Sequence, residues 1–458
     1  MRRLDETLEL EECFEQLKKD LDEGNLQDFR ETFLNIHTYE QGQFYQSLTE
    51  EQRLRLYTYL SPKELGDMFD VIEEDNEFMK DYLSEMRPSY AAEMLSEMYT
   101  DNAVDLLNTL DKKQVARYLS LMNPEDADEL RVMLHYEDDT AGSIMATEFV
   151  SIVANQTVRS AMYVLKNEAK SAETIYYIYV VDNEERLVGV LSLRDLIVAS
   201  DDTMISDIMS ERVISVHVED DQEDIAQTFR DYDFLALPVT DYEGRLLGIV
   251  TVDDIIDVID EEAVSDYSGL AGVNVDEVDE HPFKAAAKRL PWLITLLFLG
   301  MATATLISHY EDLVSEASVL AIFIPLITGT AGNAGTQSLA VAVRRLAVSD
   351  EKKASSFFMT VVGEVLTGLV TGAITGLTIF RIVAVWQGNP ILGFVIGMAM
   401  MVAITVANLA GSLIPMLMDK IGFDPAVASG PFITTLSDLT SVLIYFNIAR
   451  MFMIHFIG

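Results

Sequence analysis

Long apolar segments dominate the C-terminal part of the chain. Five of them follow one another from about residue 290, and each is close to the roughly 20 residues that a helix needs to cross a bilayer. They cover the ranges 290–309, 318–341, 356–386, 391–418 and 432–457. We therefore expect residues 290–458 to form an all-α transmembrane domain with five helices, in contact with the lipid bilayer.

Basic residues between these segments indicate their orientation. They occur before the first segment, between the second and third, and between the fourth and fifth: Lys284, Lys288 and Arg289; Arg344, Arg345, Lys352 and Lys353; and Lys420. All three places fall on one side of the membrane, which the positive-inside rule makes the cytoplasmic side. We expect a multi-pass protein of the plasma membrane with cytoplasmic N-terminal domains and its C terminus outside.

The first 140 residues show a different pattern, with apolar residues at helical spacing in short runs. Ser61-Pro62 and Asn123-Pro124 are typical of a helix N-cap followed by proline at the first helical position. The sequence around Asn123 resembles that around Ser61, which indicates a repeat array. Residues 1–140 are therefore predicted to form an acidic, superhelical α-helical domain.

A clearer internal repeat occupies residues 141–260. Residues 179–197 (YVVDNEERLVGVLSLRDLI) align with residues 238–256 (PVTDYEGRLLGIVTVDDII), and each copy is typical of strand, turn, strand and helix. Ile144-Met145 and Ile208-Met209 precede the two copies. We expect two α/β domains at 141–204 and 205–262, then a connecting helix at 263–289, in one piece or two.

The charge distribution separates the two parts of the chain. Residues 290–458 carry 7 basic and 9 acidic residues, whereas residues 1–289 carry 25 basic and 66 acidic ones, a net charge of −41. Nucleic acid is an unsuitable partner for such a surface, and cations are natural ones. The single cysteine, Cys13, excludes a disulfide framework. No P-loop, nucleophile elbow or zinc motif is present, so we expect no enzyme.

Asp438 lies in the middle of the last apolar segment. A carboxylate at that depth is costly and should face protein or water, which marks an ion path. Helical spacing predicts Thr434, Asp438, Ser441 and Tyr445 on one face and Leu439, Val442 and Leu443 on the other. The alternative is a structural Asp paired with a buried base, but Arg381 and Arg450 lie near segment ends. We favour the ion path.

The second apolar segment contains the unusual sequence IPLITGTAGNAGTQSL at residues 324–339. Gly329, Gly332 and Gly335, preceded by Pro325, disfavour a continuous helix. Irregular backbone at membrane depth is tolerated where it is buried or lines a cavity. Asn333 and Gln337 are four residues apart and would share a helix face. A close-packed interface of small residues is the alternative, and we favour a pore lining.

The repeat at 141–260 resembles a pair of cystathionine-β-synthase (CBS) domains, a regulatory module. In that family a Ser/Thr-x-x-Asp ending can hold the ribose of a nucleotide. Here the ending occurs twice, as Ser192 with Asp195 and as Thr251 with Asp254. The resemblance implies ATP or another adenine nucleotide as the ligand class of this site.

The whole chain resembles the MgtE family of magnesium channels. The resemblance rests on YEDDTAGSIM at 136–145, the CBS pair, the acidic connecting helix, GTAGNAGTQS at 329–338 and DPAVASGPFITTLSDLTSVLIYF at 424–446. It implies a homodimer that conducts Mg²⁺ and is gated by cytosolic Mg²⁺. Its pore ligands would be Asp438 with Asn333, Gly329 and Gly332. Its cytosolic magnesium sites would use Asp221, Glu223, Asp233, Asp254, Asp257 and Asp266.

Other functions remain as alternatives. The chain could carry other divalent ions such as Mn²⁺, Co²⁺ or Ni²⁺, or be a nucleotide-regulated, ion-coupled carrier. Softer metals would favour clustered Cys, His or Met ligands, and the membrane part has no Cys/His cluster. A nucleotide-regulated membrane anchor is a further alternative, against which an unpaired Asp438 argues.

Overall fold

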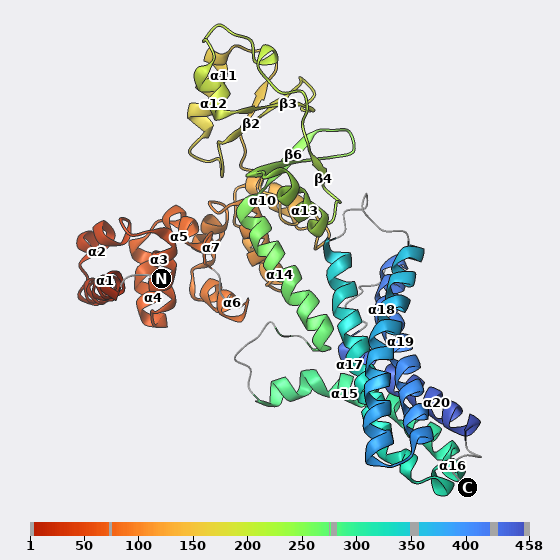
Figure 1. Cartoon of the computed structure of the whole chain (residues 1–458). Helices are drawn as coiled ribbons and strands as arrows, with labels where there is room; N and C mark the ends of the chain where they lie inside the picture. Colours follow the sequence, from red (N-terminus) through yellow and green to blue (C-terminus); the bar gives the residue numbers. More distant parts are fainter. Residues whose placement is uncertain are drawn as a thin grey trace. The chain divides into compact units, whose positions relative to one another are not determined.

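The computed structural model describes residues 4–72, 76–273, 275, 282–348, 357–421 and 429–452. Lys352, Lys353 and the start of the 424–446 motif lie outside these ranges. The chain divides into two compact units, Met1–Ile259 and Asp260–Gly458, each with its own core (Figure 1).

The N-terminal part of the first unit is entirely helical in its described residues. Its helices are α1 (Leu4–Glu23), α2 (Leu26–Phe33), α3 (Thr38–Gln46), α4 (Glu50–Tyr59), α5 (Pro62–Phe69), α6 (Asn76–Glu85), α7 (Pro88–Leu95), α8 (Thr100–Asn108), α9 (Lys112–Leu119) and α10 (Pro124–Met133). The predicted caps are confirmed. Ser61 forms a capping box at the start of α5, and the Asn123 side chain caps α10. In both cases proline occupies the first turn.

Two similar three-stranded sheets follow, one in each sequence repeat. The first contains β1 (Ser151–Val153), β2 (Tyr177–Val181) and β3 (Leu187–Ser192), with helices α11 (Val158–Glu168) and α12 (Leu193–Val198). The second contains β4 (Val216–His217), β5 (Ala236–Thr240) and β6 (Leu246–Thr251), with α13 (Gln222–Tyr232); a 3-10 turn, η1 (Ile205–Asp207), lies between the copies. Each sheet pairs its first two strands in parallel and its last two antiparallel. The predicted strand, turn, strand, helix repeat is confirmed.

The two copies exchange their opening methionines. Met209 packs so closely on Gly189 that an added Cβ would lie 2.6 Å from its sulfur, and Met145 takes the corresponding place at Gly248. Met145 opens the first copy but contacts the second, and Met209 does the reverse. The glycines at matching positions of the repeat are therefore needed for packing between the copies.

Helix α14 (Val252–Ala271) connects the CBS pair with the membrane part. It starts at the end of β6, before the predicted boundary at residue 263, and stops at Gly272, whose positive φ of 68° ends the helix. Residues 276–281, in the predicted connecting segment, lie outside the described ranges.

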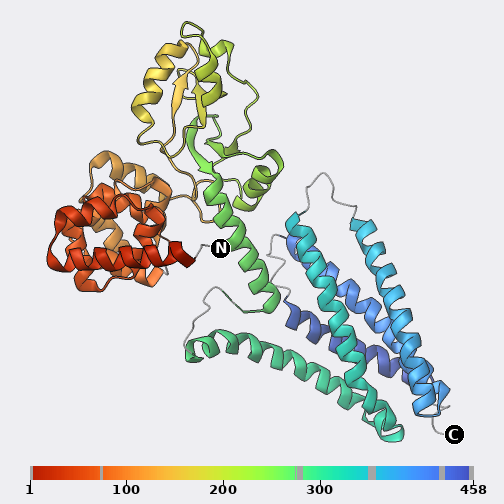
Figure 2. The same cartoon turned by 60° about the vertical axis from the view of Figure 1, so that its left-hand side comes forward.

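Among the described residues of the second unit, five helices are long and apolar enough to cross a membrane: α15 (Pro282–His309), α17 (Val319–Val348), α18 (Phe357–Trp386), α19 (Pro390–Lys420) and α20 (Gly430–Met451). A short helix, α16 (Glu311–Glu316), follows α15. Helix α19 runs alongside both α17 and α18, and Figure 2 shows α15 as one long helix.

Glycines set the close approach of the membrane helices. A Cβ at Gly376 of α18 would lie 2.4 Å from the carbonyl oxygen of Gly397 in α19, and one at Gly372 would lie 2.7 Å from that of Met401. These glycines of α18 therefore serve close packing against α19. Such contact lets two backbones touch where no side chain could fit.

The expected interruption of the second membrane segment is wrong. Helix α17 is continuous from Val319 to Val348 and contains Pro325 and all three glycines. The reason is packing: a Cβ at Gly335 would lie 3.0 to 3.3 Å from Ile433, Ser437 and the Ala407 carbonyl. Close helix contacts stabilise glycine at a position that its intrinsic propensity disfavours.

Candidate functional site

In the described part of the chain, Asp438 of helix α20 has no side-chain partner. Its N-terminus is capped by the Ser429 side chain, and Pro431 stands in its first turn. Asp438, two turns further on, is half-buried, and no side chain within the described ranges forms a hydrogen bond or ion pair with its carboxylate. The structural alternative, a buried base beside it, therefore finds no support in the described part of the chain.

The predicted polar face of α20 is only partly correct. Ser441 and Tyr445 are fully buried, and the Tyr445 hydroxyl donates to the Leu320 carbonyl of α17 at 2.9 Å. Their role is helix packing, because a helix inside a bundle buries more than one face. Thr434, one turn before Asp438, is half-buried like Asp438 itself.

The glycine-rich stretch of α17 lies beside this part of α20. A Cβ at Gly332 would be 3.0 Å from the Thr434 side chain, one turn before Asp438. Gly329 has no atom within 4 Å of its Cβ position, and Asn333 and Gln337 are exposed in a single chain. The predicted shared face of the two amides is present. Exposed amides at membrane depth require a polar neighbour, from water or from another protein surface.

Glu364 of α18 has partners on α17. Its carboxylate accepts a hydrogen bond from Ser338 Oγ at 3.0 Å and lies 3.8 Å from the Arg345 guanidinium, both on α17. Ser338 Oγ also lies 2.8 Å from the Asn408 carbonyl of α19. Glu364 therefore ties α18 to α17, in contrast to Asp438, for which the described residues provide no partner.

The end of α14 packs against the start of α20. Leu270 belongs to a cluster with Leu339, Val343 and Ile433, from α17 and α20. A Cβ at Gly272 would lie 2.6 Å from Trp292 Nε1 of α15 and 3.3 Å from Ser429, the cap of α20. The helix that leaves the CBS pair thus reaches the N-terminus of the helix that carries Asp438.

Three carboxylates meet in the first unit. They are Asp101 in the first turn of α8, Glu173 between α11 and β2, and Asp254 in the first turn of α14. One ligand atom from each lies within 4.8 Å of the others. Asp101 is 5% exposed, and one Glu173 oxygen is buried without a hydrogen-bond partner among the described residues. Hard cations such as Mg²⁺ prefer oxygen ligands of this kind.

Burial and the charges of neighbouring carboxylates raise the pKa of all three groups. Burial, and then the charge of Asp254, raises the pKa of Glu173 to about 8. Burial raises the pKa of Asp254 to about 6, against a hydrogen bond from Thr251 that lowers it. Burial and the charge of Asp254 raise the pKa of Asp101 well above its usual range. A divalent cation would remove this repulsion, so the residues fit a metal site.

Sequence reasoning identified only Asp254 of this cluster. Asp101 and Glu173 come from segments far away in the sequence, and neither lies in a motif. A helix N-terminus that begins with Thr-Asp was the only local signal for Asp101.

The other predicted cytosolic ligands are not gathered into such a cluster within the described residues of one chain. Asp221 caps α13 by accepting the Glu223 N–H at 2.8 Å, and both residues are exposed. Asp233 follows α13 in a left-handed conformation, and Asp257 is exposed on α14. Asp266 lies later on α14, in the second unit. Their role as magnesium ligands stays a prediction.

The two predicted ribose motifs differ in their surroundings. Ser192 and Asp195 form a capping box at the start of α12, with Ser192 Oγ 2.6 Å from the Asp195 carboxylate. The Thr251 hydroxyl donates to Asp254 at 2.5 Å, inside the three-carboxylate cluster. Adenine nucleotide binding stays a prediction for both motifs.

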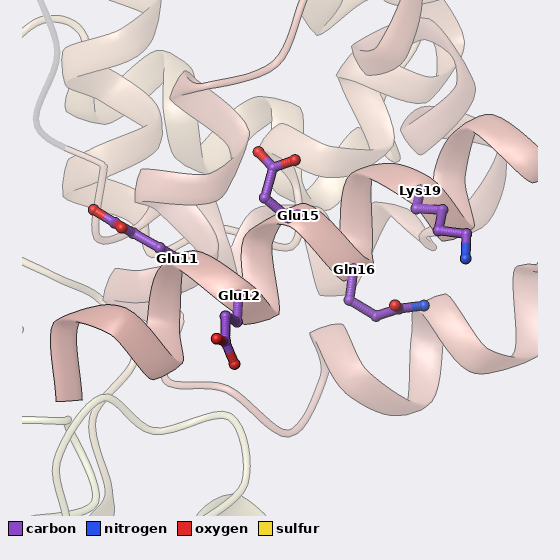
Figure 3. Close-up of a pocket in the computed structure, with 5 residues that line it drawn as sticks. All are labelled: Glu11, Glu12, Glu15, Gln16 and Lys19. Carbon is purple, nitrogen blue, oxygen red and sulfur yellow. The ribbon is translucent and has the colours of Figure 1, made fainter. Parts of the chain in front are cut away.

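A surface hollow of ≈ 540 Å³ on α1 offers no comparable site. Glu11, Glu12, Glu15, Gln16 and Lys19 line it, all from one helix and all exposed. Figure 3 shows Glu12 and Glu15 pointing to opposite sides of the ribbon, so their carboxylates do not converge on a common ligand.

Comparison with known proteins gives full-length matches. A family model described as a divalent cation transporter (MgtE) matches residues 324–448, the MgtE intracellular N domain matches 36–139, and the CBS domain matches 141–202 and 205–261. The magnesium transporter MgtE of Enterococcus faecalis is 76% identical and covers 99% of this chain and 100% of its own length. The Bacillus subtilis protein of the same name is 37% identical over 94% of this chain and 95% of its own.

Solved structures agree with these matches. A crystal structure of the soluble part of a magnesium transporter is 74% identical, with a TM-score of 0.55, and covers 56% of this chain and 99% of its own. Together, the family models, the relatives and the five apolar helices lead to one assignment: the chain belongs to the MgtE family of divalent cation transporters, membrane proteins with an intracellular N-terminal domain and no enzymatic activity.

Proposed function

We propose that this chain conducts Mg²⁺ into the cell and that cytosolic Mg²⁺ closes the path. The observation that carries the proposal is Asp438, a half-buried membrane carboxylate for which the described residues provide no partner, beside the Gly332–Asn333 stretch of α17. Mg²⁺ holds its water shell tightly and is usually bound through one or two carboxylates plus water. A single carboxylate per chain, with amides nearby, suits a hydrated ion that must also be released.

The path requires a second copy of the chain, and we infer a homodimer in the plasma membrane with the C terminus outside. In one chain the Asn333 and Gln337 amides are exposed, and α15 presents an apolar face with Leu293, Leu297 and Phe298 exposed. Amides are unfavourable against lipid, so they should face the path or the partner. Two chains would contribute two Asp438 carboxylates to one ion.

For the gate, we propose Mg²⁺ binding at Asp101, Glu173 and Asp254. Without a cation the three carboxylates repel one another, which disfavours contact between the helical domain and the CBS pair. With Mg²⁺ bound, that contact is stabilised. Asp254 lies in the first turn of α14, and the end of α14 packs on the start of α20. Helix α14 therefore links the metal site to the helix that carries Asp438. Closing requires only that the closed state bind Mg²⁺ more tightly.

The test is Mg²⁺ flux into proteoliposomes with Mg²⁺ varied independently on the two faces. Asp438→Asn should abolish or strongly reduce flux. Glu364→Gln is the matched control, because it removes a membrane carboxylate that has partners and keeps an acceptor for Ser338. Wild-type flux in Asp438→Asn would refute the pore assignment.

The same preparation tests the gate and the alternatives. A variant with Asp101→Asn, Glu173→Gln and Asp254→Asn should conduct with unchanged single-channel conductance and a flattened inhibition by Mg²⁺ on the cytosolic face. An unchanged inhibition curve would place the sensor elsewhere. Flux of Mn²⁺, Co²⁺ or Ni²⁺ equal to that of Mg²⁺, or dependence on a proton or sodium gradient, would favour the other transport functions.

A further inference from the structure

Helix α8 begins without a cap of its own. Its N-cap residue, Tyr99, makes no side-chain cap hydrogen bond. The first N–H groups of a helix have no partner within the helix and are usually satisfied by a local Ser, Thr, Asp or Asn. Here the Tyr99 N–H donates to the Asp70 carboxylate at 3.1 Å, and the Thr100 N–H donates to the Glu148 carboxylate at 3.4 Å.

Glu148 comes from the CBS part of the chain, from the segment just before β1. One of its oxygens accepts the Thr100 hydroxyl at 2.6 Å, and the other also accepts the Thr147 N–H at 3.0 Å. Thr100 and Thr147 place their hydroxyl oxygens 2.7 Å apart. The cap of a helix in the helical domain is therefore supplied by the module on which this domain packs.

The same residue borders both of the metal-site carboxylates that the sequence did not reveal. Asp101 directly follows Thr100, and the Glu148 carbonyl accepts the Glu173 N–H at 2.8 Å. Glu148 thus fixes the backbone next to Asp101 through its side chain and the backbone of Glu173 through its own carbonyl. Its two oxygens already accept three hydrogen bonds, which makes it a poorer candidate for a fourth ligand than a free carboxylate.

We propose that Glu148 is a positioning residue of the regulatory metal site. By capping α8 from the CBS side, it docks the helical domain in the register that brings Asp101 to Glu173 and Asp254, and so sets the cytosolic Mg²⁺ concentration at which transport is inhibited. This inference rests on the proposed gating function. It predicts that the hydrogen-bond acceptor at position 148, and not its charge, determines the inhibition midpoint.

The experiment compares Glu148→Ala with Glu148→Gln in the full-length protein in proteoliposomes. Both changes remove the charge, but only Gln keeps an acceptor for Thr100. The Ala variant should need about tenfold more cytosolic Mg²⁺ for half-inhibition than the Gln variant, the change expected for the loss of one neutral hydrogen bond. Saturating Mg²⁺ should still inhibit both variants fully.

Asp111→Ala is the matched control for loss of a helix cap. Asp111 caps α9 within the helical domain through a capping box with Gln114. Its removal should lower thermal stability and leave the inhibition midpoint unchanged. Hydrogen exchange of residues 97–106 in chelator should be faster in Glu148→Ala than in Glu148→Gln and unchanged in Asp111→Ala.

The outcomes separate this inference from the proposed function. Equal midpoints and equal exchange in the Ala and Gln variants would overturn the role of Glu148. A wild-type protein without any cytosolic Mg²⁺ inhibition would overturn the proposed gate. In that case, faster exchange in the Ala variant would still support capping from the CBS side, and equal exchange would refute it.

Discussion

Replacing Glu173 with Gln should stabilise the first unit when no divalent cation is present. The Glu173 carboxylate is partly buried, one of its oxygens has no hydrogen-bond partner among the described residues, and it faces Asp101 and Asp254. Gln keeps the size of the side chain, removes the charge and brings an NH₂ group toward two carboxylates. The change therefore removes a group whose ionised form is unfavourable at this site, and it also removes a metal ligand.

The magnitude follows from the pKa of Glu173. Burial and the charge of Asp254 raise this pKa from 4.5 to about 8. Since one pKa unit corresponds to about 1.4 kcal/mol, the folded state carries a penalty of roughly 3 kcal/mol at pH 7 relative to a solvated Glu. Because the folded pKa is raised, the penalty is absent below pH 4.5, grows as pH rises and is complete above pH 8. At pH 5.5, one unit above the unfolded pKa, it should be about 1.4 kcal/mol.

Thermal unfolding of the full-length protein in detergent, in chelator, measures this difference. Glu173→Gln should unfold several degrees higher than wild type at pH 7, with a smaller gain at pH 5.5. With saturating Mg²⁺ the gain should shrink or reverse, because wild type adds the free energy of ligand binding. Exposed Glu211, changed to Gln, provides the control and should shift neither profile.

Two results would contradict the reasoning. The first is a Glu173→Gln variant no more stable than wild type at pH 7 in chelator. The second is a gain that increases as pH falls, since the sign of the pKa shift requires the opposite.

Glycine substitutions give two further predictions. Gly376→Ala should destabilise the membrane part by about 1–3 kcal/mol, because its Cβ would lie 2.4 Å from the Gly397 carbonyl. Gly363→Ala on the same helix meets open space and should not destabilise it. Equal melting temperatures of the two variants would refute the close contact. Gly272→Ala should weaken inhibition at high cytosolic Mg²⁺, because the new side chain is strained at a positive φ and displaces Trp292. Gly244→Ala has the same backbone strain and no atom within 4 Å of its Cβ, so it should leave inhibition intact. Flux assays on the two variants test this difference.

Periodic and repeated features could be predicted from the sequence. Five apolar runs, the Ser61-Pro62 and Asn123-Pro124 caps and the aligned repeat all depend on neighbours within about twenty residues. The strand register of the two sheets also agrees with the sequence alignment of the repeat: Val180 lies opposite Gly189 in the first copy, and Val239 lies opposite Gly248 in the second. Local side-chain pattern determines such elements before any tertiary contact is made.

Features that depend on a distant neighbour could not be predicted. The continuous α17 contradicts glycine propensity because Gly335 gains its stability from contacts with α19 and α20. Tyr445 is polar by type yet buried, because its hydroxyl donates a hydrogen bond to the Leu320 carbonyl of α17. Asp101 joins Glu173 and Asp254 only once two domains are in contact. In each case the decisive contact comes from a distant segment of the chain, and the residue pattern along a single helix contains no information about that contact.

The contrast between the two carboxylate arrangements explains how one ion could serve as cargo and as signal. A pore ligand must exchange its ion rapidly, which favours one carboxylate per chain and a retained water shell. A sensor must hold its ion long enough to stabilise a conformation, which favours several converging carboxylates whose repulsion the ion relieves. Asp438 has no partner among the described residues, and the cluster around Asp254 has three acids. Interchanging the two arrangements would trap the ion in the path and weaken the response of the gate.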